Sequence, residues 1–277
     1  MALKLMYITN QPRIARIVEV AGVDWVFVDM ETLGKAARQG HLDSVKSHHT
    51  VEDVRAVKAA LQRAELLVRV NPINDGSAEE IERVIAAGAD IIMLPMWKSV
   101  EDAARFLNMV NGRCQTILLL ETMEAEKCLD EVLKLPLLDK IHIGLNDLHL
   151  SYGKSFMFEM LADGTVERIC RKLKEVGVTY GFGGIGRIGE GMLPAEHILG
   201  EHVRLGSQMV ILSRSFCNVE KEASEDCIKD AFETGVAVLR EHEIAYREKS
   251  CDALEENRVM LCREVAQIVA TIKGVSV

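Results

Sequence analysis

The chain has 277 residues, of which 48% are hydrophobic and 27% charged, the balance of a soluble globular domain. Its formal net charge of -9, with no basic stripe along the sequence, argues against a nucleic-acid partner. No run of about 18 apolar residues predicts a membrane span, and the short, strand-like start Met1–Tyr7 does not resemble a signal peptide, so we expect a cytoplasmic protein whose cysteines are reduced.

Short apolar segments alternate with amphipathic ones along the chain, which predicts buried parallel strands that are each followed by a helix. The expected strands are Leu3–Ile8, Trp25–Asp29, Glu65–Val70, Ile91–Leu94, Thr116–Leu120, Lys140–Gly144, Thr179–Phe182 and Met209–Leu212. The expected helices are Pro12–Ala21, one after Thr50, one from Ser77, one from Ser99, one through Leu133, Val166–Glu175, one from Pro194 and Val219–Glu241. Thr50 with Asp53 three residues later is typical of a helix N-terminus.

Eight strand–helix units with short connections predict an α/β fold of the (β/α)8 TIM barrel type. An open, doubly wound sheet is the alternative, but the turn after the first strand lacks the GxGxxG pattern that would favour it. The segment Ser250–Ile272 predicts an extra C-terminal helix, which we expect on the barrel base or on a second subunit. The chain is thus expected to form a catalytic barrel over residues 1–245 and a helical extension over residues 246–277.

Polar side chains gather where the predicted strands end, which is where barrel enzymes carry their chemistry. Asp29 and Glu31 follow the second strand, Arg69 the third, Glu121 the fifth and Asp147 the sixth. Neighbouring strands five and six allow Glu121 and Asp147 to share a divalent cation, and two carboxylates suit Mg²⁺ or Mn²⁺. The alternative is that these two acids only cap the helix and the turn that follow them.

Arg69 is interpreted either as the ion-pair partner of a neighbouring acid or as a fixed cation for a substrate oxyanion. The glycine-rich loop 181–187 either packs tightly or lets backbone N–H groups approach an anion. His48 and His49 lie in a polar stretch that reads as a surface loop. Substrate contacts are expected from the ends of strands six, seven and eight, namely Asn146, Gly184, Arg187, Ser213 and Arg214.

Between about Pro12 and Cys217 the chain resembles the HpcH/HpaI aldolase and citrate-lyase β superfamily. The resemblance lies in three segments, Ala21–Glu31, Leu118–Thr122 and Ile143–Leu148 with Gly153 after it. It implies a metal-dependent, class II carbon–carbon lyase with a 2-oxo acid and an aldehyde, or an acyl-CoA relative, as small-molecule substrates. It further implies that Glu121 and Asp147 bind the metal, that Arg69 lies near the substrate carbonyl and that the chain is a homo-oligomer.

Two positions depart from the aldolase branch of that superfamily. Thr32 stands where the branch has its acid–base histidine, and Ala86 stands where it has an aspartate. The stretch Gly34–Thr50, with Lys35 and Arg38, is also longer than expected for that branch.

The candidates for the base that transfers the proton are therefore Glu31, Asp29, a metal-bound water and a histidine of the second loop. The main prediction is a lyase that cleaves or forms 2-oxo acid aldols through a metal-stabilised enolate. The alternatives are an acyl-CoA lyase or synthase of the citryl or malyl type, and a non-catalytic barrel that has lost its base.

Overall fold

The computed structural model describes residues 2–34, 49–219, 222 and 224–274. Its strands follow the apolar segments of the sequence closely, with shifts of one residue at some ends. They are β1 (Lys4–Ile8), β2 (Trp25–Asp29), β3 (Glu65–Arg69), β4 (Ile91–Leu94), β5 (Gln115–Leu120), β6 (Lys140–Ile143), β7 (Thr179–Phe182), β8 (Gly184–Ile185) and β9 (Met209–Leu212).

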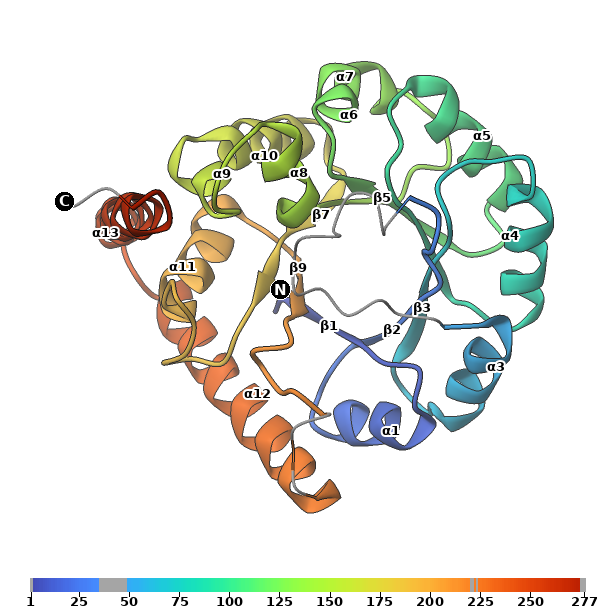
Figure 1. Cartoon of the computed structure of the whole chain (residues 1–277), viewed down its shortest axis with the longest axis horizontal. Helices are drawn as coiled ribbons and strands as arrows, with labels where there is room; N and C mark the ends of the chain where they lie inside the picture. Colours follow the sequence, from blue (N-terminus) through green and yellow to red (C-terminus); the bar gives the residue numbers. More distant parts are fainter. Residues whose placement is uncertain (1, 35–48, 220–221, 223, 275–277) are drawn as a thin grey trace.

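All strand pairs are parallel, in the order β7-β6-β5-β4-β3-β2-β1-β9-β8. The seventh predicted strand coincides with β7, and an additional short strand, β8, follows it after Gly183, whose φ of +54° lies in the left-handed region. The backbone N–H of Gln208 donates to the carbonyl of Tyr180 at 2.8 Å, and that of Ile211 donates to the carbonyl of Gly183 at 3.4 Å. These bonds join β9, the eighth strand of the barrel, to the end of β7, the seventh. The predicted (β/α)8 barrel is confirmed, and helices surround it in Figure 1.

The helices begin where the sequence supplies caps. Thr50 and Asp53 form the expected reciprocal capping box, and Ser99 and Ser224 each accept a hydrogen bond from a backbone N–H of the following turn. The helices are α1 (Pro12–Val20), α3 (Val51–Ala60), α4 (Ser77–Ala86), α5 (Val100–Val110), α6 (Met123–Lys127), α7 (Leu129–Val132), α8 (Leu145–Ser151), α9 (Glu159–Ala162), α10 (Thr165–Val176), α11 (Ala195–Leu205), α12 (Glu225–Arg247) and α13 (Cys251–Ile272).

Three segments differ from the prediction by more than a residue at a helix end. The helix after β5 is broken at Cys128 into α6 and α7, and the long connection after β6 contains two short helices, α8 and α9. The helix expected from Val219 begins only at Glu225, because Ser224 caps it there.

The C-terminal helix α13 lies on the flank of the barrel, against α11 and α9, and not on the barrel base (Figure 1). Packing on a second subunit, the other expected place, stays a prediction. The contact is close because residue 200 is glycine: a Cβ there would lie 2.3 Å from the Asn257 amide nitrogen. Asn257 also bonds His197 of α11 at 2.8 Å. The division into residues 1–245 and 246–277 stays a prediction.

Two apolar clusters support the barrel. Inward-facing side chains such as Phe27, Leu67 and Leu119 fill its interior, while outward-facing ones such as Val28, Leu118 and Leu120 pack against the helices. This alternation follows from the two-residue period of a strand. Leu120 faces the helices, so the same period directs the next residue, Glu121, toward the barrel interior.

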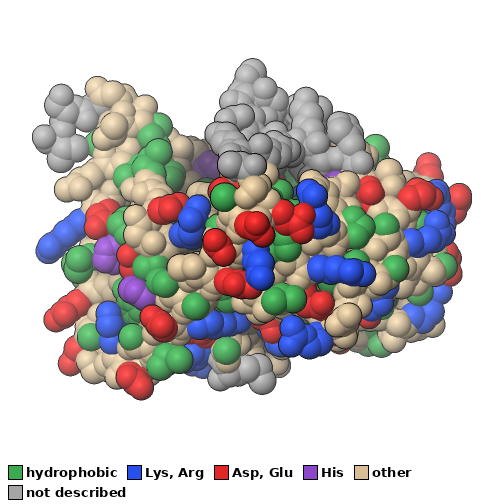
Figure 2. Space-filling model, turned by 90° about the horizontal axis from the view of Figure 1, so that it is seen from below, with side chains coloured by type: hydrophobic (Ala, Val, Ile, Leu, Met, Phe, Trp, Pro, Cys, Tyr) green, Lys and Arg blue, Asp and Glu red, His purple; other side chains and the backbone are tan. Residues whose placement is uncertain are grey.

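The described surface agrees with the composition. Acidic and basic side chains are interspersed over the face in Figure 2, which shows no continuous basic stripe among the described residues. All seven cysteines are free thiols. In the part of the chain that the structure describes, no helix is long and apolar enough to cross a membrane.

Candidate functional site

A cavity of about 410 Å³ opens at the carboxyl ends of the strands. It contains most of the residues expected from the sequence, whereas Glu31 and Arg187 do not line it. The expected residues in its wall are Asp29, Arg69, Glu121, Asn146, Asp147, Gly184, Ser213 and Arg214.

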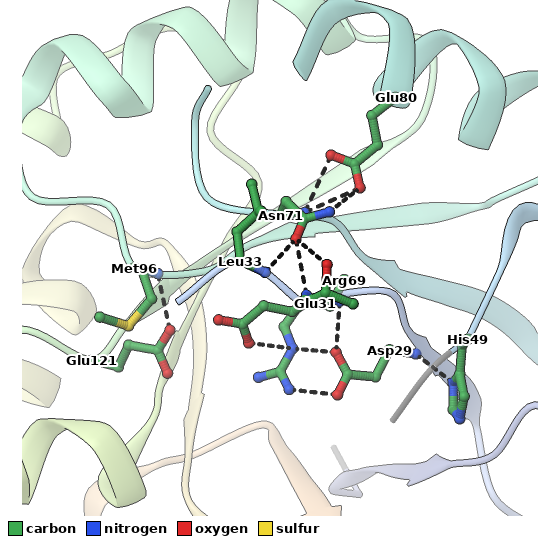
Figure 3. A network of polar contacts seen from close by, with 10 residues as sticks. Asp29, Glu31, Leu33, His49, Arg69, Asn71, Glu80, Met96 and Glu121 are labelled. Atoms are coloured by element: carbon green, nitrogen blue, oxygen red, sulfur yellow. Dashed lines mark hydrogen bonds and ion pairs between the residues drawn. The ribbon is translucent and has the colours of Figure 1, made fainter. Parts of the chain in front are cut away.

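Arg69 is held by two acids of the neighbouring strand and its loop (Figure 3). Parallel pairing sets Asp29 opposite Arg69, and the guanidinium donates to both Asp29 carboxylate oxygens at 2.9 and 2.8 Å. Glu31 lies 3.4 Å from the Arg69 Nε. Both acids are buried, and together with Glu121 they raise the pKa of the Arg69 guanidinium far above its usual value despite its desolvation. The arginine is therefore a permanent, fixed cation in the cavity wall.

The turn after β2 is fastened to the start of the connection after β3. The Asn71 side-chain oxygen accepts hydrogen bonds from the backbone N–H groups of Thr32 and Leu33 at 2.9 and 3.0 Å. The Asn71 amide nitrogen in turn donates to Glu80 at 2.8 Å (Figure 3). This network fixes the path of the chain through Glu31, so the acid beside Arg69 has a defined position.

Glu121 follows β5 as an almost fully buried carboxyl. Its Oε1 accepts a hydrogen bond of 2.9 Å from the backbone N–H of Met96, a residue in the left-handed conformation with φ 53°. A Cβ at Gly144 would lie 3.0 Å from Glu121 Oε2, so the carboxyl needs glycine at the end of β6. Burial raises the pKa of Glu121 to about 8, with added contributions from the negative charges of Asp147 and Glu31.

Asp147 lies in the first turn of α8, half-buried, with the exposed Asn146 beside it. It lines the same cavity as Glu121, and its negative charge contributes to the raised pKa of Glu121. Within the described residues no group of three His, Cys, Asp or Glu side chains could hold a metal alone. Two carboxylates that share negative charge in a cavity wall nevertheless fit Mg²⁺ or Mn²⁺, which take their other ligands from water and substrate.

Other expected residues lie elsewhere or outside the described chain. Arg187 points to α12, where its Cδ would lie 3.5 Å from a Cβ at Gly235, and its Nε lies 3.6 Å from Glu190. Ala86 is exposed at the end of α4. Lys35, Arg38 and His48 fall outside the described residues.

Of the histidine pair in the second loop, His49 is described and lines the cavity. Its Nδ1 accepts a hydrogen bond of 2.9 Å from the backbone N–H of Asp29.

Sequence reasoning missed His142, which borders the cavity from within β6. The signal was present in Lys140–Ile143, where polar and apolar residues alternate. With Ile141 and Ile143 in the outer core, the two-residue period turns His142 toward the barrel interior.

Solved structures with this fold have low sequence identity to the chain. An HpcH/HpaI aldolase from Desulfitobacterium hafniense DCB-2 is 19% identical over 76% of this chain and 86% of its own, with a TM-score of 0.58. An HpcH/HpaI aldolase/citrate lyase family protein from Burkholderia cenocepacia J2315 is 17% identical over 76% and 88%, with a TM-score of 0.60. The citrate synthase SbnG is 18% identical over 77% and 87%, with a TM-score of 0.58. These likenesses confirm the fold.

The curated proteins compared with this sequence include no significant match. The family model of the HpcH/HpaI aldolase/citrate lyase family, in contrast, matches residues 4–180, which is more than half of the chain. This range contains β1 to β6, the first two residues of β7, and the residues Asp29, Arg69, Glu121 and Asp147. It supports an enzyme with a lyase-type function. On this match, the chain belongs to the HpcH/HpaI aldolase/citrate lyase family.

Proposed function

We propose that this protein is a metal-dependent carbon–carbon lyase of the class II aldolase type, which cleaves or forms 2-oxo acid aldols through an enolate. The observation that carries the proposal is the cavity wall itself, where Glu121, Asp147 and the fixed cation Arg69 face one space. Enolate chemistry needs positive charge at an oxygen atom, and this wall offers both a fixed cation and a pair of acids suited to a second one.

Glu121 and Asp147 would hold the metal, with Mg²⁺ or Mn²⁺ as the ion that suits carboxylate ligands. The raised pKa of Glu121 supports this role, because a buried carboxyl beside other acids is stabilised as an anion when a cation joins it. When bound, the metal supplies Lewis-acid polarisation of the substrate carbonyl and stabilises the negative charge of the enolate.

Arg69 binds and orients the developing enolate oxygen in this scheme. Both Asp29 oxygens already accept hydrogen bonds from the Arg69 guanidinium, so Asp29 fixes the arginine in the wall. Glu31 adds a second negative charge 3.4 Å from the Arg69 Nε. We assign these two acids to orienting the cation.

The remaining wall binds the rest of the substrate. Asn146 offers an amide at the first turn of α8, and Gly184 exposes backbone beside Ser213 and Arg214. These residues suit the polar or anionic groups of an aldehyde partner.

We also propose a homo-oligomer, because α13 exposes Val259, Met260 and Ile272 on the outside of the barrel. A cytoplasmic location stays a prediction.

The test uses protein stripped of metal with EDTA and then reloaded with Mg²⁺ or Mn²⁺. We expect metal-dependent cleavage of a 4-hydroxy-2-oxo acid, detected as release of the shorter 2-oxo acid. Glu121→Ala and Asp147→Ala should each abolish turnover and weaken metal binding measured by titration calorimetry. Glu124→Ala, which removes an exposed acid of α6 three residues after Glu121, is the matched control and should change neither.

Full activity and full metal affinity in either cavity variant would contradict the proposal. Turnover restricted to CoA thioesters would instead assign the citryl or malyl type of reaction.

A further inference from the structure

His142 lies at the floor of the cavity and has no role in the scheme above. It is part of β6, its side chain is fully buried at 0% exposure, and the residue belongs to the cavity wall. Its strand partner in register is Leu119, which also faces the barrel interior and the cavity. A titratable ring thus lies among apolar side chains in the interior layer beneath the proposed metal site.

The protein fixes which ring nitrogen of His142 carries the proton. The Nε2 atom lies 3.1 Å from the carbonyl oxygen of Gly183, and a carbonyl can only accept, so Nε2–H is the donor. In the neutral ring, the Nδ1 atom then presents a lone pair. Nδ1 is buried, and within the described residues no side chain or backbone group bonds to it.

The ring stays neutral under physiological conditions. Burial, together with the positive charge of Arg69, lowers the pKa of His142 to about 4. The side chain is therefore a hydrogen-bond acceptor, and a cationic or donor role for Nδ1 is unfavourable above that pH. Buried acceptors in proteins almost always have a donor, so an unpartnered one that borders a cavity points to a ligand or a water as its partner.

We infer that His142 is a substrate-binding residue whose Nδ1 accepts a hydrogen bond from the hydroxyl group of an aldol substrate. This inference rests on the proposed function, in which the hydroxyl is the group that distinguishes an aldol from a simple 2-oxo acid. A hydroxylated ligand satisfies the lone pair, whereas a deoxy ligand leaves it buried and unpaired. A site built in this way rejects the deoxy compound.

His202 provides a matched control. It is equally buried at 0% exposure, and it also has one ring nitrogen, Nε2, without a hydrogen-bond partner among the described residues. Its ring stacks on Phe182 at a centroid distance of 3.9 Å, and its Nδ1 lies 2.7 Å from Ser207 Oγ. His202 belongs to α11 and does not line the cavity. Replacing it disturbs the same part of the fold without removing a group from the cavity.

The experiment compares two probes on the Mg²⁺-loaded enzyme. The first is 4-hydroxy-2-oxopentanoate, measured by kcat/KM, and the second is 2-oxopentanoate, measured by its inhibition constant. His142→Phe should lower kcat/KM by roughly tenfold or more and change the inhibition constant less than twofold. His142→Gln, which keeps a donor for Gly183 and an acceptor, should recover part of the loss, and His202→Phe should alter neither constant.

A spectroscopic signature separates binding from a structural effect. In wild-type protein with ¹⁵N-labelled histidine, Nδ1 of His142 should have the shift of an unprotonated nitrogen, and that shift should move with the hydroxylated probe only. Equal losses for both probes in His142→Phe, or a protonated Nδ1, would overturn the inference while the lyase activity of the wild type stood. If the Mg²⁺-loaded wild type neither cleaves nor binds these probes, the proposed function fails and this inference fails with it.

Discussion

The carboxyl of Glu121 should make the metal-free protein lose stability as the pH rises. Its pKa in the folded protein is raised from 4.5 to about 8. The unfolded chain releases this proton above about pH 4.5, whereas the folded protein retains it, so the free energy of unfolding falls between pH 4.5 and 8. We expect Glu121→Gln, which cannot ionise and can still accept the Met96 N–H bond, to remove this loss.

The magnitude follows from the difference between the two pKa values. A shift of about 3.5 units at about 1.4 kcal/mol per unit lowers the free energy of unfolding by roughly 5 kcal/mol above pH 8. At pH 7 the loss is roughly 3 kcal/mol, because only the interval from pH 4.5 to pH 7 has then contributed. Glu121→Gln should be more stable than wild type by these amounts, and the two should converge below pH 4.5. The measurement is urea unfolding followed by circular dichroism between pH 4 and 9, in EDTA.

Three further comparisons make this result specific. Asp147→Asn removes one of the charges that raise the pKa of Glu121, so its stability should decline less with pH than that of the wild type. Glu124→Gln, at an exposed site, should follow the wild-type curve. Addition of Mg²⁺ at pH 8 should stabilise the wild type and not Glu121→Gln. Parallel pH curves for wild type and Glu121→Gln between pH 5 and 8 would refute the reasoning.

Other variants test how the site is built. Arg69→Met removes the cation that is paired with the buried Asp29 carboxylate, so chemical denaturation should show a loss of about 3–5 kcal/mol, and a loss below 1 kcal/mol would contradict the buried pair. Gly144→Ala brings a Cβ to 3.0 Å from the Glu121 carboxyl, so calorimetry should show weaker Mg²⁺ binding, and unchanged affinity would argue against this contact. Thr50→Ala removes the cap of α3 and should cost about 1 kcal/mol in thermal unfolding, while Thr50→Ser should retain most of it.

Local patterns in the sequence determine most of the fold. Apolar runs such as Trp25–Asp29 and Ile91–Leu94 coincide with β2 and β4, because a strand buried on both faces must be apolar throughout. Serine and threonine caps set the starts of α3 and α5 for the same local reason, since they satisfy backbone N–H groups that the helix leaves open. The short strand β8 after Gly183 could not be predicted from such patterns, because it depends on pairing with β9 when the barrel closes.

For the site, too, some features could be predicted from the sequence and others depended on the tertiary structure. The position of Glu121, Asp147 and Arg69 at the ends of apolar strands identified them as residues of one rim, and the structure places all three in one cavity wall. The direction of Arg187 depended on the neighbouring α12, which no pattern in its own loop encodes.

What the sequence determined by itself is the set of charged groups at the carboxyl ends of the strands. Only the tertiary structure decided their electrostatic states: Asp29 holds Arg69 as a charged ion-pair partner, burial raises the pKa of Glu121, and desolvation leaves His142 uncharged with an open lone pair. These states arise from distances and burial between residues far apart in the chain, because the energy of a charge depends on what surrounds it in space.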